Sequence, residues 1–288
     1  MQSNDCIIPV DSPIGQALRD AARDRRFIFV AGLPSSGKSL LLQQLTILAN
    51  QVGRSVHSLQ WDSARQAFET ERALAKYPEI DGLTHPGIRK AVGLWVREAI
   101  SAWHTRHSSS EDILIAELPV VGGRFVELLR PEEDDAESLL NGTETVFFVP
   151  VPTLEMRNQI TAMRAETFAN PRNEKETKDA PPHIVDEEWV SACQLYNAWN
   201  GLPNNHKTDV QYDPAIYRSV FQRLARYRNL KLLVIDQKFE TKGSAYERPV
   251  RVEELLATEE AVKAAFAKLE ELYPGKATQR AIDGWDDY

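Results

Sequence analysis

The sequence has few cysteines and no long apolar segment. Its 288 residues include only two cysteines, Cys6 and Cys193, which stand far apart and belong to no metal or redox motif. Unpaired thiols favour a reducing compartment, so we expect a cytoplasmic protein with free thiols. No apolar run approaches the roughly 20 residues of a membrane-spanning helix, and the polar residues at the start give no secretory signal. We therefore expect no membrane association.

An excess of basic residues is also missing. The chain has 34 lysines and arginines against 42 aspartates and glutamates, which gives a formal net charge of -8. This charge disfavours nonspecific binding to nucleic acids, although a local basic groove is compatible with it. The apolar fraction of 42% is enough for a substantial core. The length suits one large α/β domain over residues 1–288.

The strongest signal lies between residues 27 and 42. An apolar, strand-like run over 27–31 is followed by the sequence GLPSSGKS over 32–39, which fits the Walker A or P-loop pattern G-x-x-x-x-G-K-[ST]. Glycines let such a loop curl around a phosphate, and backbone N–H groups then point at the anion. Lys38 would reach the β- and γ-phosphates, and the Ser39 hydroxyl would ligate Mg²⁺. The predicted nucleotide-binding residues are Gly32, Ser35, Ser36, Gly37, Lys38, Ser39 and Leu40.

A glycine turn that binds no ligand is the alternative interpretation of this pattern. It is disfavoured by the context, because a buried parallel strand should precede a P-loop and a helix should follow it. We therefore expect a site for a nucleoside triphosphate, ATP, with Mg²⁺.

Strand-like and helix-like segments alternate along the chain. Apolar runs predict strands over 27–31, 55–60, 112–116, 145–149 and 230–236. This alternation predicts a three-layer α/β sandwich, with a five-stranded parallel sheet between two layers of helices. The segment between the fourth and fifth strands is too long for one crossover. We therefore expect a lid or helical insertion over residues 152–214.

Acidic residues lie at the ends of three predicted strands, the second, the third and the fifth (Asp236), at the edge where open parallel sheets bind ligands. Glu117 follows the third strand, where an acid would help to hold Mg²⁺; the alternative is an ordinary surface acid. Asp62 follows the second strand and is suited to accept a proton from a substrate hydroxyl. Arg65, three residues later, would grip a substrate phosphate. The alternative is that Asp62 caps a helix and Arg65 is a surface arginine.

Arginines in two predicted helices are further candidates. Arg157 and Arg164 lie seven residues apart in the proposed lid, where they would reach both flanks of the triphosphate and stabilise the transition state. A solvated helix face is the alternative. Arg89 and Arg97 are weaker candidates for binding a substrate phosphate.

Two other patterns predict no chemistry. The acidic run over 131–137 is typical of a solvated surface turn. His104 and His107 have the H-x-x-H spacing of metal ligands, but no third ligand lies nearby in the sequence, so a polar helix end is the favoured interpretation.

The loop over 32–39, together with Asp62 and Arg65, resembles the P-loop small-molecule and polynucleotide kinase group, such as zeta toxins and polynucleotide 5′-kinases. The motif GLPSSGKS also resembles the one in the seryl-tRNA kinase branch and its tRNA-modification ATPase relatives. This resemblance implies the strand order 2-3-1-4-5 and an arginine-bearing lid after strand four. It covers the P-loop and the order of elements. The chain departs from it over 253–271, which is rich in glutamate where a basic tRNA-binding domain would be expected.

Three functions are compatible with these observations. The first is an ATP-dependent kinase that transfers the γ-phosphoryl group to an acceptor hydroxyl, on a small molecule or a nucleic-acid end. The second is a nucleotide-gated switch or assembly protein with slow or incidental hydrolysis. The third is an RNA-linked ATPase. Release of ADP that depends on an acceptor distinguishes the kinase from the switch, and hydrolysis stimulated by tRNA with a steep salt dependence would support the third function.

Overall fold

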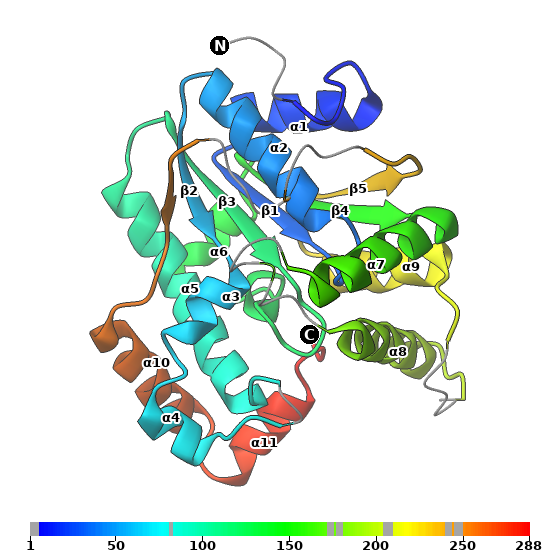
Figure 1. The fold of residues 1–288 in the computed structure, drawn as a ribbon. Helices are drawn as coiled ribbons and strands as arrows, with labels where there is room; N and C mark the ends of the chain where they lie inside the picture. The colour runs from blue at the N-terminus through cyan, green and yellow to red at the C-terminus, as the bar shows by residue number, and fades with distance from the viewer. Residues whose placement is uncertain are drawn as a thin grey trace.

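A six-stranded sheet forms the centre of the computed structural model, which describes residues 6–80, 83–171, 176, 181–203, 210–239, 244 and 250–288 (Figure 1). Every pair of neighbouring strands is parallel, in the order β5-β4-β1-β3-β2-β6. The strands are β1 (Phe27–Ala31), β2 (Ser55–Leu59), β3 (Asp112–Leu118), β4 (Thr145–Pro152), β5 (Leu230–Ile235) and β6 (Val252–Glu254).

The predicted α/β fold with a parallel sheet is confirmed, but the predicted number of five strands is wrong. The five predicted strands lie in the order 2-3-1-4-5, and β6 adds a sixth strand beside β2. In the register of this pair, Glu253 lies opposite His57. Two of the three residues of β6 are glutamates, so no apolar run marks this strand in the sequence.

Helices cover both faces of the sheet (Figure 1). Successive side chains of a strand point to opposite faces. Ile28 and Val30 therefore join the core under α1 and α2, whereas Phe27 and Phe29 join the larger core that includes α5 and α9. The helices are α1 (Pro13–Asp24), α2 (Lys38–Gln51), α3 (Trp61–Gln66), α4 (Glu71–Lys76), α5 (Pro86–Arg106), the 3₁₀ helix η2 (Val126–Leu128), α6 (Asp135–Leu140), α7 (Leu154–Ala169), α8 (Pro182–Trp199), α9 (Pro214–Leu224), α10 (Glu259–Leu272) and α11 (Lys276–Asp283).

Capping side chains fix where several of these helices begin. The hydroxyl of Ser12 accepts a hydrogen bond from the N–H of Gly15 at the start of α1, and Pro13 is the first residue of that helix. Thr153 caps α7 and Thr258 caps α10 in the same manner. α7 begins directly after β4, beside the sheet edge where the candidate site lies.

The segment between β4 and β5 consists mainly of helices. The predicted insertion over 152–214 contains α7 and α8, which contact each other, and α8 contacts α9. Residues 172–175, 177–180 and 204–209 of this insertion lie outside the described residues. Within the described ranges, no helix combines the length and the apolar character needed to cross a membrane.

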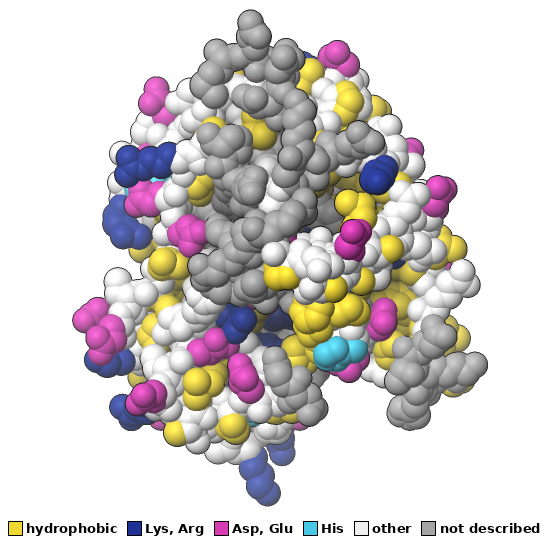
Figure 2. Space-filling view, viewed as in Figure 1, with side chains coloured by type: hydrophobic (Ala, Val, Ile, Leu, Met, Phe, Trp, Pro, Cys, Tyr) yellow, Lys and Arg dark blue, Asp and Glu magenta, His cyan; other side chains and the backbone are white. Residues whose placement is uncertain are grey.

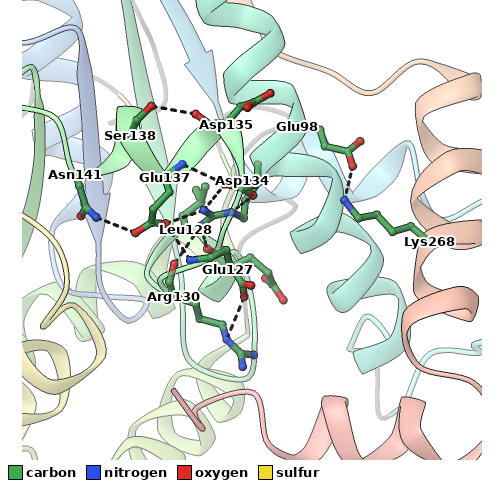
Figure 3. Close-up of polar contacts among 12 residues, drawn as sticks. Glu98, Glu127, Leu128, Arg130, Asp134, Asp135, Glu137, Ser138, Asn141 and Lys268 are labelled. Atoms are coloured by element: carbon green, nitrogen blue, oxygen red, sulfur yellow. Dashed lines mark hydrogen bonds and ion pairs between the residues drawn. The ribbon is translucent and has the colours of Figure 1, made fainter.

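Residues 131–135 of the acidic run over 131–137 are exposed, as predicted for a solvated turn, but two of its carboxylates, Asp134 and Glu137, bind arginines. Asp134, which lies near Glu137 in Figure 3, caps α6. Its carboxylate accepts two hydrogen bonds of 2.6 Å from the guanidinium of Arg97. Glu137 accepts hydrogen bonds from Arg97 at 2.8 Å and from Arg228 at 2.7 Å. The side chain of Arg97 is only 5% exposed and needs these carboxylates. Arg97 is therefore engaged within the fold, which corrects its assignment to a substrate phosphate.

Candidate functional site

A cavity of about 580 Å³ opens at the carboxyl ends of the strands. It is bounded by the β1–α2 loop, α3, the end of β3, one face of α7 and the residues after β5. Ten of the residues predicted from the sequence line it: Ser35, Gly37, Lys38, Ser39, Leu40, Asp62, Arg65, Arg89, Glu117 and Arg164. Of the described residues predicted for the site, Gly32, Ser36 and Arg157 lie outside this lining.

The β1–α2 loop has the backbone of a tight turn. Gly32, Ser35 and Gly37 have positive φ angles of 155°, 59° and 93°. A Cβ atom at Gly32 would lie 2.6 Å from the hydroxyl of Tyr217, so this position also has no room for a side chain. No side chain caps the start of α2, and the Ser35 hydroxyl is buried without a hydrogen-bond partner among the described residues. The loop therefore presents unused donors beside the cavity.

Lys38 is held at the base of the cavity by the loop and by β3. Its ammonium group donates a hydrogen bond of 2.9 Å to the carbonyl of Leu33 and lies 3.6 Å from a carboxylate oxygen of Glu117. Burial lowers the pKa of Lys38, and the negative charge of Glu117 opposes this effect. Arg164 on α7 adds a further positive charge near Lys38. The centre of the cavity thus combines positive charge with one carboxylate.

Asp62 and Arg65 project from the first turn and a half of α3. The carboxylate of Asp62 lies 3.1 Å from the Arg65 guanidinium, which also binds Glu69 at 2.7 Å. The N-cap of α3 is Gln60, so the interpretation of Asp62 as the helix cap is wrong. The Asp62 side chain is 56% exposed and faces the cavity, whereas Glu69 also accepts a hydrogen bond from Thr84. Glu69 therefore fixes Arg65 in place, and Asp62 remains accessible to a ligand.

Arg89 lies on the cavity wall, and its hydrogen bonds go to backbone carbonyls. Its guanidinium donates to the carbonyl of Thr84 at 2.7 Å and to that of Gly122 at 3.0 Å. Burial lowers the pKa of Arg89 to about 10, with a further contribution from the nearby charge of Arg124. Backbone carbonyls carry only partial negative charge, so they do not neutralise the positive charge of Arg89. An anionic ligand would supply the missing negative charge.

Arg124 is a cavity residue that the sequence analysis missed. It follows two glycines with positive φ angles, Gly122 and Gly123, and pairs with Glu188 of α8 at 2.5 Å. The glycine pair a few residues after the third predicted strand is the only signal that marks this turn in the sequence. Nothing in the sequence places Glu188 opposite Arg124, because α8 reaches it through the tertiary fold.

Arg157 and Arg164 do not share one environment, although both belong to α7. Arg157 is buried, donates a hydrogen bond to the carbonyl of Pro34 and lies 5.5 Å from the ring centre of Tyr212. Arg164 lines the cavity. Arg157 thus supports the β1–α2 loop from behind, and Arg164 is the arginine of α7 that a ligand in the cavity would meet.

Apolar side chains form the other part of the cavity wall. Ile8, Leu40 and Phe239 belong to the core on the α2 side of the sheet, and Ile160 and Met163 contribute from α7. Figure 2 shows hydrophobic side chains over the neighbouring ends of α7 and α8, beside a hollow in which basic side chains are visible. An apolar wall next to a charged base suits a ligand with a flat ring and an anionic end.

Comparisons with family models, with curated proteins and with solved structures found no match to this chain. The α/β fold with its parallel sheet is compatible with a Rossmann-like layout. The case for a function therefore rests on the residues of this chain and on their geometry.

Proposed function

We propose that this protein is a P-loop kinase that transfers the γ-phosphoryl group of ATP to an acceptor hydroxyl. The observation that carries the proposal is the convergence in one cavity of the β1–α2 loop, Lys38, Glu117 and Asp62. The loop satisfies the Walker A pattern, and its glycines and unused donors suit a phosphate chain. Lys38 and Arg164 supply the positive charge that the β- and γ-phosphates require.

Each remaining residue has a role that follows from its position. Ser39 and Glu117 are oxygen donors beside the phosphate site and would hold Mg²⁺, which prefers oxygen ligands. The ion would neutralise part of the charge on the phosphates. Asp62 accepts the proton of the acceptor hydroxyl as its oxygen attacks the γ-phosphorus, and the bond to the bridging oxygen of ADP breaks. Arg157 keeps the loop in its bent conformation.

The acceptor that best fits the cavity carries a negative charge. Arg65, Arg89 and Arg124 lie on its wall together with Asp62. Arg65 and Arg124 have carboxylate partners, but Arg89 binds only backbone carbonyls among the described residues. A phosphate or carboxylate group on the acceptor would complete the coordination of Arg89. We therefore assign the acceptor to the class of anionic hydroxyl compounds, which includes small phosphorylated metabolites and nucleic-acid ends.

The test has two parts. Calorimetry with ATP and Mg²⁺ should show one binding site, and a panel of hydroxyl compounds should contain an anionic member that strongly stimulates ADP production. Absence of ATP and GTP binding would overturn the nucleotide site itself. Nucleotide binding with hydrolysis that responds to a protein partner, and to no acceptor, would instead favour a nucleotide-gated switch. Stimulation by tRNA with a steep salt dependence would favour an RNA-linked ATPase.

A further inference from the structure

A second group of chemically active side chains lies at the amino ends of the strands, away from the cavity. His57 is the middle residue of β2, Asp112 is the first residue of β3, and His107 directly follows α5. Parallel pairing places β2 beside β3, and the turn after α5 brings His107 back over them. Glu117, near the other end of β3, belongs to the nucleotide cavity. The two groups are therefore separated by most of the length of this strand.

The three side chains already have the spacing of metal ligands. Nε2 of His57 lies 3.5 Å from one carboxylate oxygen of Asp112, and Nδ1 of His107 lies 3.8 Å from the other. The possible ligand atoms of the three residues all lie within 4.8 Å of one another. Ligand atoms at zinc distances in a tetrahedral site are about 3.3 Å apart. Small side-chain rotations would therefore be enough to close the site around an ion.

Ring contacts hold both imidazoles in place. The rings of His57 and His107 have centres 4.2 Å apart, and each packs against Trp103 at 5.3 Å.

The carboxylate of Asp112 pairs with the two histidines, whereas the hydrogen bonds of the nearby arginines go to backbone carbonyls. Arg54 donates to the backbone carbonyl of Asp112, and Arg26 donates to the carbonyl of Ser109. The carboxylate of Glu253 on β6 lies 4.0 Å from Nδ1 of His57, on the side opposite Asp112. Histidine ligands of metals commonly have a carboxylate at their second nitrogen, and Glu253 is positioned for this role.

We propose that His57, His107 and Asp112 bind a divalent zinc ion. Two imidazole nitrogens and one carboxylate oxygen suit zinc better than Mg²⁺ or Ca²⁺, which prefer oxygen ligands. The side chain of His107 is 25% exposed and that of His57 is 7% exposed, so water can reach the outer side of the site as a fourth ligand. The ion would join the end of α5 to β2 and β3. Its main effect would be to stabilise the fold, because zinc bound only by the native state shifts the unfolding equilibrium.

The H-x-x-H spacing of His104 and His107 pairs two histidines that do not lie in the same group of side chains. His104 forms a ring contact with Phe27, and His107 is the member of the pair that joins the cluster. The missing ligands come from β2 and β3, which are adjacent to His107 only in the fold.

Zinc titration of tag-free, EDTA-treated full-length protein tests the proposal. We expect one equivalent of Zn²⁺ to bind in competition with a chromogenic chelator and to raise the melting temperature. D112N and H107Q should each weaken zinc binding by about tenfold or more. E111Q, which changes the exposed neighbouring carboxylate, should bind zinc like the wild type. E117Q should also retain this equivalent, which excludes the nucleotide cavity as its location.

Cobalt gives a readout that does not depend on stability. The Co²⁺-loaded wild type should show the visible absorption of a four-coordinate ion, and folded D112N, verified by circular dichroism, should lack it. E253Q should weaken zinc binding less than D112N does. Absence of saturable zinc binding by the wild type, or equal binding by the wild type, D112N and H107Q, would overturn the proposal.

Discussion

The ammonium group of Lys38 lies 3.6 Å from the carboxylate of Glu117, so the start of α2 and the end of β3 meet in an ion pair at the base of the cavity. The parallel register explains the contact, because Val30 of β1 lies opposite Glu117 of β3. Both side chains are largely shielded from water, and a shielded pair interacts more strongly than an exposed one. A triphosphate beside Lys38 would bring negative charge close to Glu117, and Mg²⁺ would offset that repulsion.

E117Q should therefore change the metal dependence of nucleotide binding. We expect its affinity for ATP with Mg²⁺ to fall by about tenfold, which corresponds to about 1.4 kcal/mol. Its affinity for ATP in EDTA should stay the same or rise, because the substitution removes a negative charge near the phosphates. Calorimetry with and without Mg²⁺ measures both quantities. Equal Mg²⁺ dependence in the variant and the wild type would remove Glu117 from the metal site.

D62N should separate phosphoryl transfer from nucleotide binding. An amide cannot accept the proton of the acceptor hydroxyl, so we expect kcat to fall by about 10² to 10⁴. The dissociation constant for ATP should change by less than about threefold, because Asp62 is not part of the β1–α2 loop that we propose binds the phosphates. Steady-state kinetics and calorimetry provide the two measurements. D135N, at an exposed first-turn position of α6, is the matched control. Unchanged turnover by D62N would exclude Asp62 as the base.

R89Q should weaken binding of the acceptor and leave binding of ATP intact. Arg89 is the cavity arginine whose partners among the described residues are backbone carbonyls, so an anionic acceptor would gain most from its charge. We expect the acceptor KM to rise by about tenfold or more in R89Q and by less in R89K, which retains the charge. R106Q, at the exposed end of the same helix, is the control. An equal loss of ATP affinity in R89Q would contradict an acceptor role.

The sequence predicted those features that local patterns determine. All five residues of β1 are buried, and this burial requires the continuous apolar run that predicts the strand. The positions of Lys38, Asp62 and Glu117 at one edge follow from the parallel connections, because each residue comes shortly after a strand. Their common cavity could therefore be anticipated before the structure was known.

Features that depend on which side chains meet across the fold were not predictable. Arg97 and Arg157 look alike in an amphipathic helix, yet Arg97 binds Asp134 and Arg157 binds the carbonyl of Pro34. The short strand β6 has no apolar residues beyond Val252, so it forms only because the edge of β2 is available for pairing. In each case the decisive partner is distant in the sequence and contributes no local periodicity.

Protonation of Glu137 in acid should lower the free energy of unfolding, because the contacts of its carboxylate with two arginines depend on its negative charge. Burial alone would raise its pKa, but hydrogen bonds from Arg228 and Arg97 lower it to about 2 from a usual value of 4.5. A carboxyl with a lowered pKa in the folded state stabilises the protein above its unfolded-state pKa, and this contribution disappears as the pH falls through the folded-state value. The shift corresponds to at most about 3 kcal/mol.

E137Q should therefore have a lower free energy of unfolding than the wild type at pH 7, by about 2 to 3 kcal/mol. The difference should shrink as the pH falls from about 5 to about 2, because the wild-type carboxyl also loses its charge there. Urea denaturation of both proteins at several pH values measures this difference in the free energy of unfolding. E132Q, on an exposed residue of the same segment, should show little difference at any pH. A difference between E137Q and the wild type that is constant from pH 7 to pH 2 would show that packing, rather than the charge of Glu137, stabilises this cluster.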